Sequence, residues 1–201
     1  VSLAVSSPSP GEGKSLISAN LAMSFADAGL RTVLVDGDTR RGTIHEMFGI
    51  AVSPGLTDYL ASNASIQDIS RATAQDKLTV IPCGIRHRAN PELLTSPLLV
   101  TLVDQLKAEY DVVIFDTPPL AAGIDAYSIA VAAGSLALVL RVGQTERRMA
   151  AAKMRMFERL PVDLVGAVLN GIEFQGEYEY YGYVGGYAAD EEPGTAIANV
   201  P

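Results

Sequence analysis

The sequence lacks several features that would assign it to a particular class of protein. Its 201 residues include no tryptophan and a single cysteine, Cys83, so no internal disulfide can form and a reducing compartment is indicated. Basic residues are scarce, because 15 Lys and Arg face 23 Asp and Glu and leave a net charge of −8. This balance argues against a general nucleic-acid binder, and we expect no nucleic-acid partner.

Long hydrophobic runs, a leader sequence and metal-binding patterns are missing as well. The most apolar run, Ile129–Leu140, is too short for a membrane helix, which needs roughly 20 residues. The chain starts at Val1 without a signal-peptide pattern, so we expect a fragment whose preceding part could hold a membrane anchor. The histidines, His45 and His87, lack partners at ligand spacing, and Cys83 is expected to be a packed residue; no metal site is predicted for them.

The residues that are present predict one α/β domain. Hydrophobic residues make up 48% of the chain, and β-branched apolar runs alternate with helical patterns, which indicates a mostly parallel sheet between two helical layers. We therefore expect a three-layer α/β/α fold of the P-loop NTPase type. The expected strands are Ser2–Ser6, Thr32–Val35, Leu78–Pro82, Asp111–Phe115, Leu136–Val142 and Leu164–Leu169; the expected helices are Lys14–Ala28, Arg40–Phe48, Leu56–Leu60, Ser65–Ala72, Pro91–Tyr110 and Glu146–Arg159.

The first motif is the loop between the first expected strand and helix. It reads Pro-Gly-Glu-Gly-Lys-Ser over 10–15, which is the second half of a phosphate-binding loop, but Pro8 stands where the common pattern has glycine. Gly11 and Gly13 let backbone N–H groups approach phosphate, and the helix N-terminus favours an anion. We expect Lys14 to reach the β- and γ-phosphates and Ser15 to hold Mg²⁺. The alternative interpretation is a glycine turn that caps a helix.

Two further motifs end expected strands with carboxylates. The stretch VLVDGDTRRG, residues 33–42, delivers Asp36 and Asp38, and the stretch DVVIFDTPP, residues 111–119, delivers Asp116. Close carboxylates repel each other unless a cation lies nearby, and Mg²⁺ with Lys14 would supply one. Each motif alone also fits a solvated turn or an ordinary strand end. In parallel sheets, ligands bind at this carboxyl edge, so the three motifs together predict a nucleotide site.

Together the three motifs resemble those of the bacterial tyrosine kinases of the Wzc and CapB type, which belong to the MinD/ParA-like branch of P-loop ATPases. These are cytoplasmic kinase domains of capsular and exopolysaccharide export systems. The stretches DTRRGTIHEMFG (38–49), NPELLTSP (90–97) and GAVLN (166–170) are similar to segments of that family, and Pro8 fits a family variant of the loop. The helix with a Glu/Arg oligomerisation motif that opens the family's domain has no counterpart in this sequence.

The resemblance implies ATP and Mg²⁺ as cofactors and assigns roles to residues of this chain. Ser15 is expected to contact Mg²⁺ directly, and Asp38 and Asp116 through water. Asp36 is expected to orient the incoming tyrosine hydroxyl or accept its proton, and Lys14 and Arg40 complete the candidate catalytic set. The candidate nucleotide-binding residues are Pro10, Gly11, Glu12, Gly13, Lys14, Ser15, Leu16 and Asn170, of which Asn170 is implied to lie near the adenine.

The C-terminal residues differ in composition from the rest of the chain. We expect a kinase domain over 1–172 and a flexible, acidic, tyrosine-rich tail over 173–201. Five of the eight tyrosines lie in this tail, and residues 173–192 contain six acids and no Lys or Arg. The alternatives are a sticky disordered tail or an edge strand that packs on a partner. The family resemblance favours phosphoacceptors, namely Tyr178, Tyr180, Tyr181, Tyr183 and Tyr187.

The leading hypothesis is thus a protein-tyrosine autokinase that modifies its tail in trans and regulates polysaccharide polymerisation and export at the cytoplasmic face of the membrane. Expected partners are further copies of the chain, possible other protein substrates, and a membrane activator or polysaccharide co-polymerase domain. One alternative is a MinD/ParA-like ATPase switch, whose signature lysine near the start of the loop is absent here. A second is a nucleotide-binding interaction module with little turnover. The basic residues around Arg147 and Arg148 form either a solvated face or a surface that attracts a neighbour's acidic tail.

Overall fold

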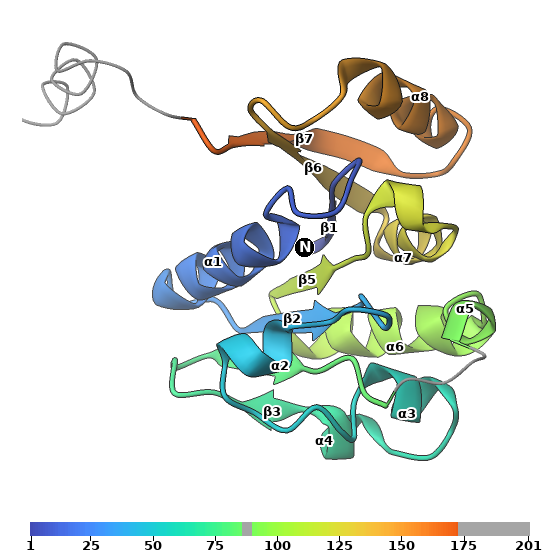
Figure 1. Ribbon diagram of the computed structural model, residues 1–201. Coiled ribbons are helices and arrows are strands. Elements are labelled where there is room, and N and C mark those ends of the chain that lie inside the picture. Colours follow the sequence, from blue (N-terminus) through green and yellow to red (C-terminus); the bar gives the residue numbers. More distant parts are fainter. Residues whose placement is uncertain (86–89, 173–201) are drawn as a thin grey trace, which may run out of the picture. The chain divides into compact units, whose positions relative to one another are not determined.

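In the computed structural model, which describes residues 1–85 and 90–172, seven strands form one sheet in the order β3-β4-β2-β5-β1-β6-β7 (Figure 1). The strands are β1 Ser2–Ser6, β2 Thr32–Asp36, β3 Arg71–Ala72, β4 Leu78–Ile81, β5 Val112–Asp116, β6 Ser135–Arg141 and β7 Asp163–Asn170. All neighbouring pairs are parallel except β3 with β4. The predicted α/β fold with a mostly parallel sheet is confirmed.

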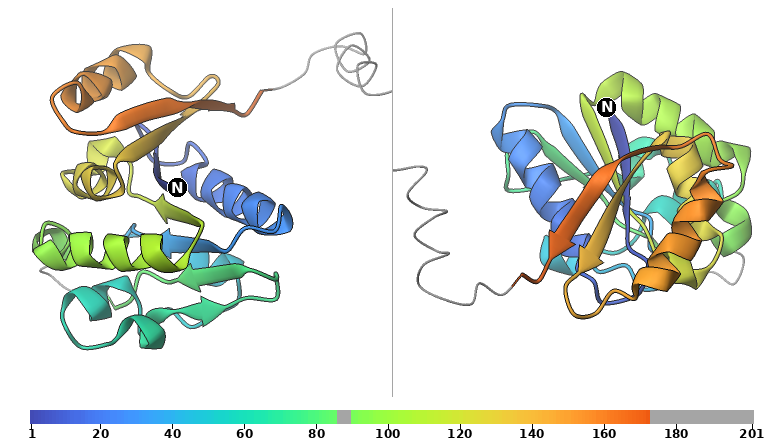
Figure 2. Two further views of the ribbon diagram at one scale, coloured as in Figure 1. Left: turned by 180° about the vertical axis from the view of Figure 1, so that it is seen from behind. Right: turned by 90° about the horizontal axis from the view of Figure 1, so that it is seen from above.

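Helices cover both faces of this sheet. They are α1 Lys14–Asp27, α2 Ile44–Met47, α3 Leu56–Leu60, α4 Ile66–Ile69, α5 Asn90–Leu93, α6 Pro97–Glu109, α7 Asp125–Ala133 and α8 Arg147–Phe157, with a short 3₁₀ turn at Leu120–Ala122. Figure 2 shows α1 on one face of the central strands and α6 and α7 on the other. The described residues Val1–Asn170 form one compact unit.

Alternation along the strands divides the core between the two faces. Leu34 and Ile114 pack with the alanines of α1, whereas Val33, Val35 and Phe115 pack with α6 and α7. Every residue of β2 and β5 is buried, as expected for strands covered on both sides. Apolar β-branched sequence on both sides of the central strands therefore accounts for the three layers.

The register of the central strands determines where the polar strand ends meet. In the pairing of β2 with β5, Asp36 lies opposite Asp116. Strand β1 pairs with the other side of β5, so the loop that follows β1 opens at the same edge. Three segments that are distant in the sequence are thereby brought together at the carboxyl edge of the sheet.

Several expected elements differ from those observed. The helix expected over Arg40–Phe48 is reduced to α2, because the Asp38 carboxylate accepts the N–H groups of Arg40 and Arg41 and holds a turn. Helix α7 was not predicted, since Gly134, at a φ of 87°, divides the apolar run into the end of α7 and the start of β6. The two-residue strand β3 lies where the end of a helix was expected.

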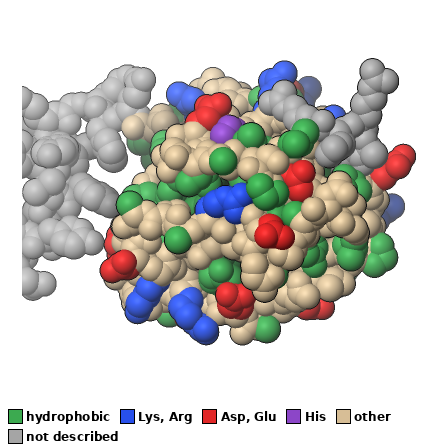
Figure 3. Space-filling model, turned by 90° about the horizontal axis from the view of Figure 1, so that it is seen from below, with side chains coloured by type: hydrophobic (Ala, Val, Ile, Leu, Met, Phe, Trp, Pro, Cys, Tyr) green, Lys and Arg blue, Asp and Glu red, His purple; other side chains and the backbone are tan. Residues whose placement is uncertain are grey.

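Two observations concern the helices and the surface charge of the described residues. Within residues 1–85 and 90–172, no helix combines the length and the apolar character needed to cross a bilayer. On the described part of the face in Figure 3, basic side chains are interspersed with acidic ones and form no continuous stripe.

Candidate functional site

The loop between β1 and α1 has the backbone of an anion-binding site. Gly11 and Gly13 have φ angles of 78° and 95°, in the left-handed region that glycine adopts without strain. The first bond of the helix runs from the N–H of Ile17 to the carbonyl of Gly13, at 3.0 Å. The N–H groups of the first turn, at Lys14 to Leu16, precede any intrahelical partner and are available to a phosphate.

The side chain of Glu12 holds this loop from within the protein. It is fully buried, accepts the N–H of Ser9 at 2.7 Å, and accepts a hydrogen bond from the hydroxyl of Thr145. Thr145 lies between β6 and α8, so a segment distant in sequence fixes the loop. Glu12 was predicted to bind nucleotide, and the structure turns its carboxylate inward, where it organises the loop.

Three more side chains donate hydrogen bonds to carbonyl groups of the loop. Asn170 donates to the carbonyl of Glu12 at 3.0 Å, and Arg141 donates to the carbonyl of Gly11 at 3.0 Å. Gln144 donates to the carbonyl of Pro10 at 3.1 Å. A Cβ at position 13 would lie 2.2 Å from Nδ2 of Asn170, so glycine is required there on steric grounds as well. Asn170, which the resemblance implies to lie near adenine, thus lies against the loop itself.

Lys14 points toward the carboxylates delivered by the neighbouring strands. Its Nζ lies 3.3 Å from Oδ2 of Asp38 and 3.9 Å from Oδ2 of Asp116, and it donates to the Ser15 hydroxyl at 3.2 Å. The hydroxyl of Ser18 lies 3.2 Å from Oδ1 of Asp116. The structure therefore brings the predicted residues Lys14, Ser15, Asp38 and Asp116 together.

Burial raises the pKa of two acids that end strands, Asp116 and Asp36. Burial raises the pKa of Asp116 to about 6, and the charge of Lys14 counteracts that rise. Burial also raises the pKa of Asp36 to about 8, with a further contribution from the negative charge of Asp116. Carboxylates confined in this way are stabilised by an added cation.

The residues present fit a magnesium ion. Oδ2 of Asp116 is buried and accepts no hydrogen bond from the described residues, although Lys14 lies nearby. A hydroxyl and two carboxylates supply the oxygen donors that Mg²⁺ prefers. The predicted Mg²⁺ residues Ser15, Asp38 and Asp116 thus form a candidate donor set beside the phosphate loop.

Asp36 lies behind this cluster and not in the cleft. Its carboxylate is fully buried and accepts the N–H groups of Asp38 and Ile44 at 3.2 Å each. A Cβ at Gly42 would lie 2.5 Å from one of its oxygens, so the turn that leads to α2 packs directly on it. The carboxylate does not line the cleft, and the expected contact between Asp36 and a tyrosine hydroxyl stays a prediction.

Arg40 faces the cleft and is held by an acid that the sequence motifs did not include. Its Nε donates to Oδ2 of Asp125 at 3.0 Å. Asp125 is buried at the start of α7, while the side chain of Arg40 is about half exposed. The ion pair fixes the stem of the arginine and leaves the rest of its guanidinium toward solvent.

These groups border a cleft of about 630 Å³, large enough for a nucleotide. It is lined by Pro10, Gly11, Lys14, Ser15, Asp38, Arg40, Arg41, Thr43, Pro118, Pro119 and Ala122. The predicted residues Glu12, Gly13, Leu16, Asp36, Asp116 and Asn170 are not part of that lining; Leu16 is 53% exposed on the first turn of α1. The predicted acceptors Tyr178, Tyr180, Tyr181, Tyr183 and Tyr187 lie outside the described residues.

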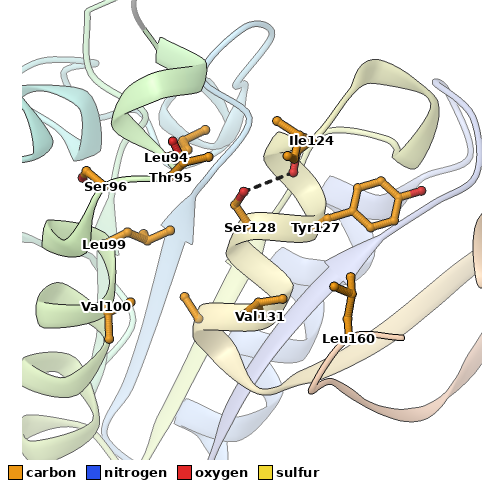
Figure 4. A pocket seen from close by; sticks show the side chains of 11 residues that line it. Leu94, Thr95, Ser96, Leu99, Val100, Ile124, Tyr127, Ser128, Val131 and Leu160 are labelled. Atoms are coloured by element: carbon orange, nitrogen blue, oxygen red, sulfur yellow. Dashed lines mark hydrogen bonds between the residues drawn. The ribbon is translucent and has the colours of Figure 1, made fainter. Parts of the chain in front are cut away.

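A second hollow, of about 300 Å³, lies between α6 and α7 (Figure 4). Its lining is mostly apolar and includes Leu99, Val100 and Val131, with Ser128 bonded to the carbonyl of Ile124 at 3.3 Å. No charged side chain lines it. The cleft beside Lys14, which has charged side chains in its lining, is therefore the candidate nucleotide site.

The fold and the cleft define the class of protein. A P-loop ATPase is recognised by three parts that this chain has: a strand, a glycine-rich loop with Lys14 and Ser15, and buried acids at strand ends. A family model described as "AAA domain" matches residues 2–145. The septum site-determining protein MinD of Pyrococcus horikoshii, solved with Mg-ADP, has the same fold: the TM-score is 0.73 at 21% identity, over 83% of this chain and 68% of that one.

Within this class, closer relatives specify the family. The tyrosine-protein kinase YwqD of Bacillus subtilis (strain 168) is 37% identical over 183 residues, which are 90% of this chain and 77% of that protein. The kinase domain of the Escherichia coli tyrosine kinase ETK superposes with a TM-score of 0.83 at 29% identity, over 87% of this chain and 69% of that one. The chain belongs to the bacterial tyrosine-protein kinases, and the family predicted from the sequence is confirmed.

Other curated tyrosine-kinase relatives are much longer than this chain. The chain spans 26% and 27% of the lengths of two of them, at 35% and 34% identity. The activity, substrates and partners of a whole protein of that kind are therefore matters of proposal for this chain.

Several residues of the site were missed by the sequence analysis. Thr145, Arg141 and Gln144 hold the phosphate loop from the segment after β6, and Ser18 supports Asp116. The spacing of residues along the sequence does not predict these contacts, because each joins two segments that lie about 100 residues or more apart.

Proposed function

We propose that the chain is an ATP-dependent protein-tyrosine autokinase that modifies the C-terminal tyrosines Tyr178, Tyr180, Tyr181, Tyr183 and Tyr187. The observation that carries the proposal is the convergence of Lys14, Ser15, Asp38 and Asp116 at one end of a nucleotide-sized cleft. Family membership supports the choice of tyrosine as acceptor.

ATP with Mg²⁺ is the proposed phosphoryl donor. The N–H groups of the loop and the ammonium of Lys14 bind the β- and γ-phosphates and offset charge that develops during transfer. Ser15, Asp38 and Asp116 would hold the ion. When bound, Mg²⁺ neutralises charge on the phosphate oxygens. Arg40, which Asp125 holds at the cleft, is placed to contact the transferred phosphoryl group or the acceptor segment.

In the transfer step, the phenol oxygen of a tyrosine forms a bond to the γ-phosphorus. The bond from that phosphorus to the bridging oxygen breaks, and ADP leaves with the electron pair. The phenol proton passes to solvent or to a cleft carboxylate. Since the transition state is loose, positioning contributes more than a strong base. Asp36 then acts as a positioning residue, which holds the backbone of Asp38 and Ile44 in place.

The proposal extends to the setting of the reaction. The acceptor tail belongs to a neighbouring copy, and the copies assemble as a homo-oligomer such as a ring. A membrane activator or co-polymerase domain binds at the cytoplasmic face of the membrane. Phosphorylation there regulates polymerisation and export of capsular or exopolysaccharide. These points rest on the family resemblance and on the acidic, tyrosine-rich composition of 173–201.

The test compares the protein with a Lys14→Met variant after incubation with Mg-ATP, and phosphate is mapped by mass spectrometry. We expect phosphotyrosine within 173–201 of the unaltered protein and none in the variant, because Lys14 is the cation nearest the phosphates. Release of ADP with unmodified tyrosines would instead identify an ATPase switch of the MinD type. If neither phosphotyrosine nor ADP forms, the chain is a binding module, and the kinase proposal is contradicted.

A further inference from the structure

Three cationic side chains line the nucleotide-sized cleft, namely Lys14, Arg40 and Arg41. Lys14 lies 3.3 Å from Asp38 and 3.9 Å from Asp116, and the proposed function assigns it to the phosphates. Arg41 is exposed and forms no ion pair in the part of the chain that the structure describes. Its positive charge is therefore available to a second ligand beside the nucleotide.

The guanidinium of Arg40 also has donors left after its ion pair with Asp125. Nε donates to Oδ2 of Asp125 at 3.0 Å, and neither Nη atom makes a hydrogen bond to the described residues. A Cβ built on Gly123 would lie 3.7 Å from Nη2, so this end of the side chain lies beside the turn before α7. The buried acid holds the stem of the arginine, and the two Nη groups can donate to an incoming carboxylate as a pair.

One carboxylate fixes the backbone of both arginines. Oδ1 of Asp38 accepts the N–H of Arg40 at 3.3 Å and that of Arg41 at 2.9 Å. Groups that are positioned before binding lose less conformational entropy when a ligand arrives. The two arginines are thus placed for an anion next to the phosphate loop.

The segment that carries the proposed acceptors has the complementary charge. Residues 173–192 contain six acids and no Lys or Arg. Tyr178 and Tyr180 each follow directly after a glutamate, and we call them the acid-flanked tyrosines. Tyr183 and Tyr187 have no acid within two positions, and we call them the unflanked tyrosines. The chain therefore offers two kinds of acceptor that differ in the charge beside the phenol.

We propose that Arg40 and Arg41 form an acceptor subsite that recognises a carboxylate next to the tyrosine, with Asp125 as the residue that positions Arg40. The inference rests on the proposed kinase function and names its acceptor class, a tyrosine flanked by an acid. Adjacent residues are about 3.8 Å apart along the chain, so a glutamate bound at the arginines holds its neighbouring phenol close to the phosphoryl donor. Arginines that contacted the nucleotide alone would not distinguish one tyrosine from another.

Initial rates at individual tyrosines of the full chain test the subsite. The protein is incubated with Mg-ATP, and phosphate at each tyrosine is quantified by tandem mass spectrometry at early times. In a variant with both Arg40→Gln and Arg41→Gln, the rate at the acid-flanked tyrosines relative to the unflanked ones should fall about tenfold, because two exposed ion pairs are lost. An unchanged ratio, or an equal loss at all tyrosines, would overturn the subsite and leave the kinase proposal standing. Absence of phosphotyrosine in the unaltered chain would contradict both.

The acceptor segment allows the reciprocal test. Glu177→Gln combined with Glu179→Gln should lower the same ratio by about the same factor, and should lower it no further in the chain that lacks both arginines. Glu191→Gln combined with Glu192→Gln removes equal charge from the same segment at a distance from the tyrosines, and is the matched control. An equal decrease in that control would overturn recognition of the neighbouring acid.

Two single variants test the positioning of Arg40. Asp125→Asn keeps the shape of the side chain and removes its charge, so the ratio should fall about threefold. Arg40→Lys keeps the positive charge but replaces the guanidinium fork by one ammonium, which cannot hold Asp125 and an acceptor carboxylate together as the fork does. It should lower the ratio to a similar extent. Binding of Mg-ADP shows that each variant is folded, and a folded Asp125→Asn with an unchanged ratio would overturn the positioning role.

Discussion

At the scale of single residues, the site is a balance between buried negative charge and one cation. Asp38 and Asp116 are buried beside Lys14, and Asp36 lies opposite Asp116 in the register of β2 and β5. A fold that confines acids in this way loses stability when no ligand cation is bound. The same confinement strengthens the binding of magnesium and nucleotide.

Replacement of Asp116 by Asn should stabilise the protein in the absence of nucleotide. Because the folded pKa, about 6, exceeds the ordinary value, the ionised acid lowers stability, with an upper bound of about 3 kcal/mol. That loss develops as the pH rises from about 4 to about 6 and is complete above. Differential scanning fluorimetry at pH 8 should show a melting temperature several degrees higher for Asp116→Asn, and a smaller further rise with Mg-ADP.

The matched control lies at the other end of the same strand. Asp111, just before β5, has a pKa lowered to about 2 by its hydrogen bond to Arg31, so its charge stabilises the fold. That contribution is complete above the ordinary pKa and is lost as the pH falls through about 2. Asp111→Asn should therefore lower the melting temperature at pH 8. A decrease for both variants would contradict the account of Asp116.

At the scale of elements, the phosphate loop depends on the segment between β6 and α8. Thr145, Arg141 and Gln144 contact the loop, and the end of β7 supplies Asn170. These contacts fix the loop before nucleotide binds, which lowers the ordering cost of binding. The segment after β6 thus belongs to the nucleotide site although it contains none of the motifs.

Thr145→Val should weaken nucleotide binding. The variant keeps the shape of the side chain and leaves one oxygen of the buried Glu12 without its hydroxyl donor, a loss of about 1 kcal/mol or more. We expect the dissociation constant of Mg-ADP, measured by calorimetry, to rise about fivefold. Thr101→Val, which removes an exposed hydroxyl bonded within α6, is the control. Equal affinities for both variants would remove the loop-supporting role of Thr145.

The sequence predicted most elements because their signals are local. Gly11 and Gly13 before Lys14 mark the loop, and apolar strands ending in Asp36 and Asp116 mark the sheet edge. What could not be predicted depends on approach in space. The end of α7 at Gly134 is hidden in an apolar run, and the inward turn of Glu12 depends on Thr145.

At the scale of the whole molecule, charge is unevenly distributed along the chain. The net charge is −8, with six acids in 173–192, while α8 carries Arg147, Arg148, Lys153 and Arg155. Arg147 and Arg148 are exposed. Opposite charges on two parts of one chain favour encounters between copies, because such attraction acts over about 10 Å at ordinary salt.

Reversal of Arg147 and Arg148 to Glu should slow autophosphorylation several-fold, since a neighbour's acidic tail would be attracted less. The initial rate of phosphotyrosine formation, followed at several protein and salt concentrations, measures this. The difference should shrink as salt rises, because screening weakens the attraction in the unaltered protein. The double variant Lys77→Glu, Lys107→Glu, whose two lysines are exposed and lie outside α8, controls for the same change in net charge. A rate as high as that of the control would exclude a docking role for α8.

The central claim is that one magnesium nucleotide binds where the loop after β1 meets the ends of β2 and β5. A crystal structure with Mg-ADP tests it most directly. We predict the β-phosphate against the N–H groups of Gly11 to Ser15, with Lys14 in contact, and Mg²⁺ beside Ser15 with Asp38 and Asp116 within one water molecule of it. An empty cleft at saturating nucleotide, or ADP bound between α6 and α7, would contradict the account.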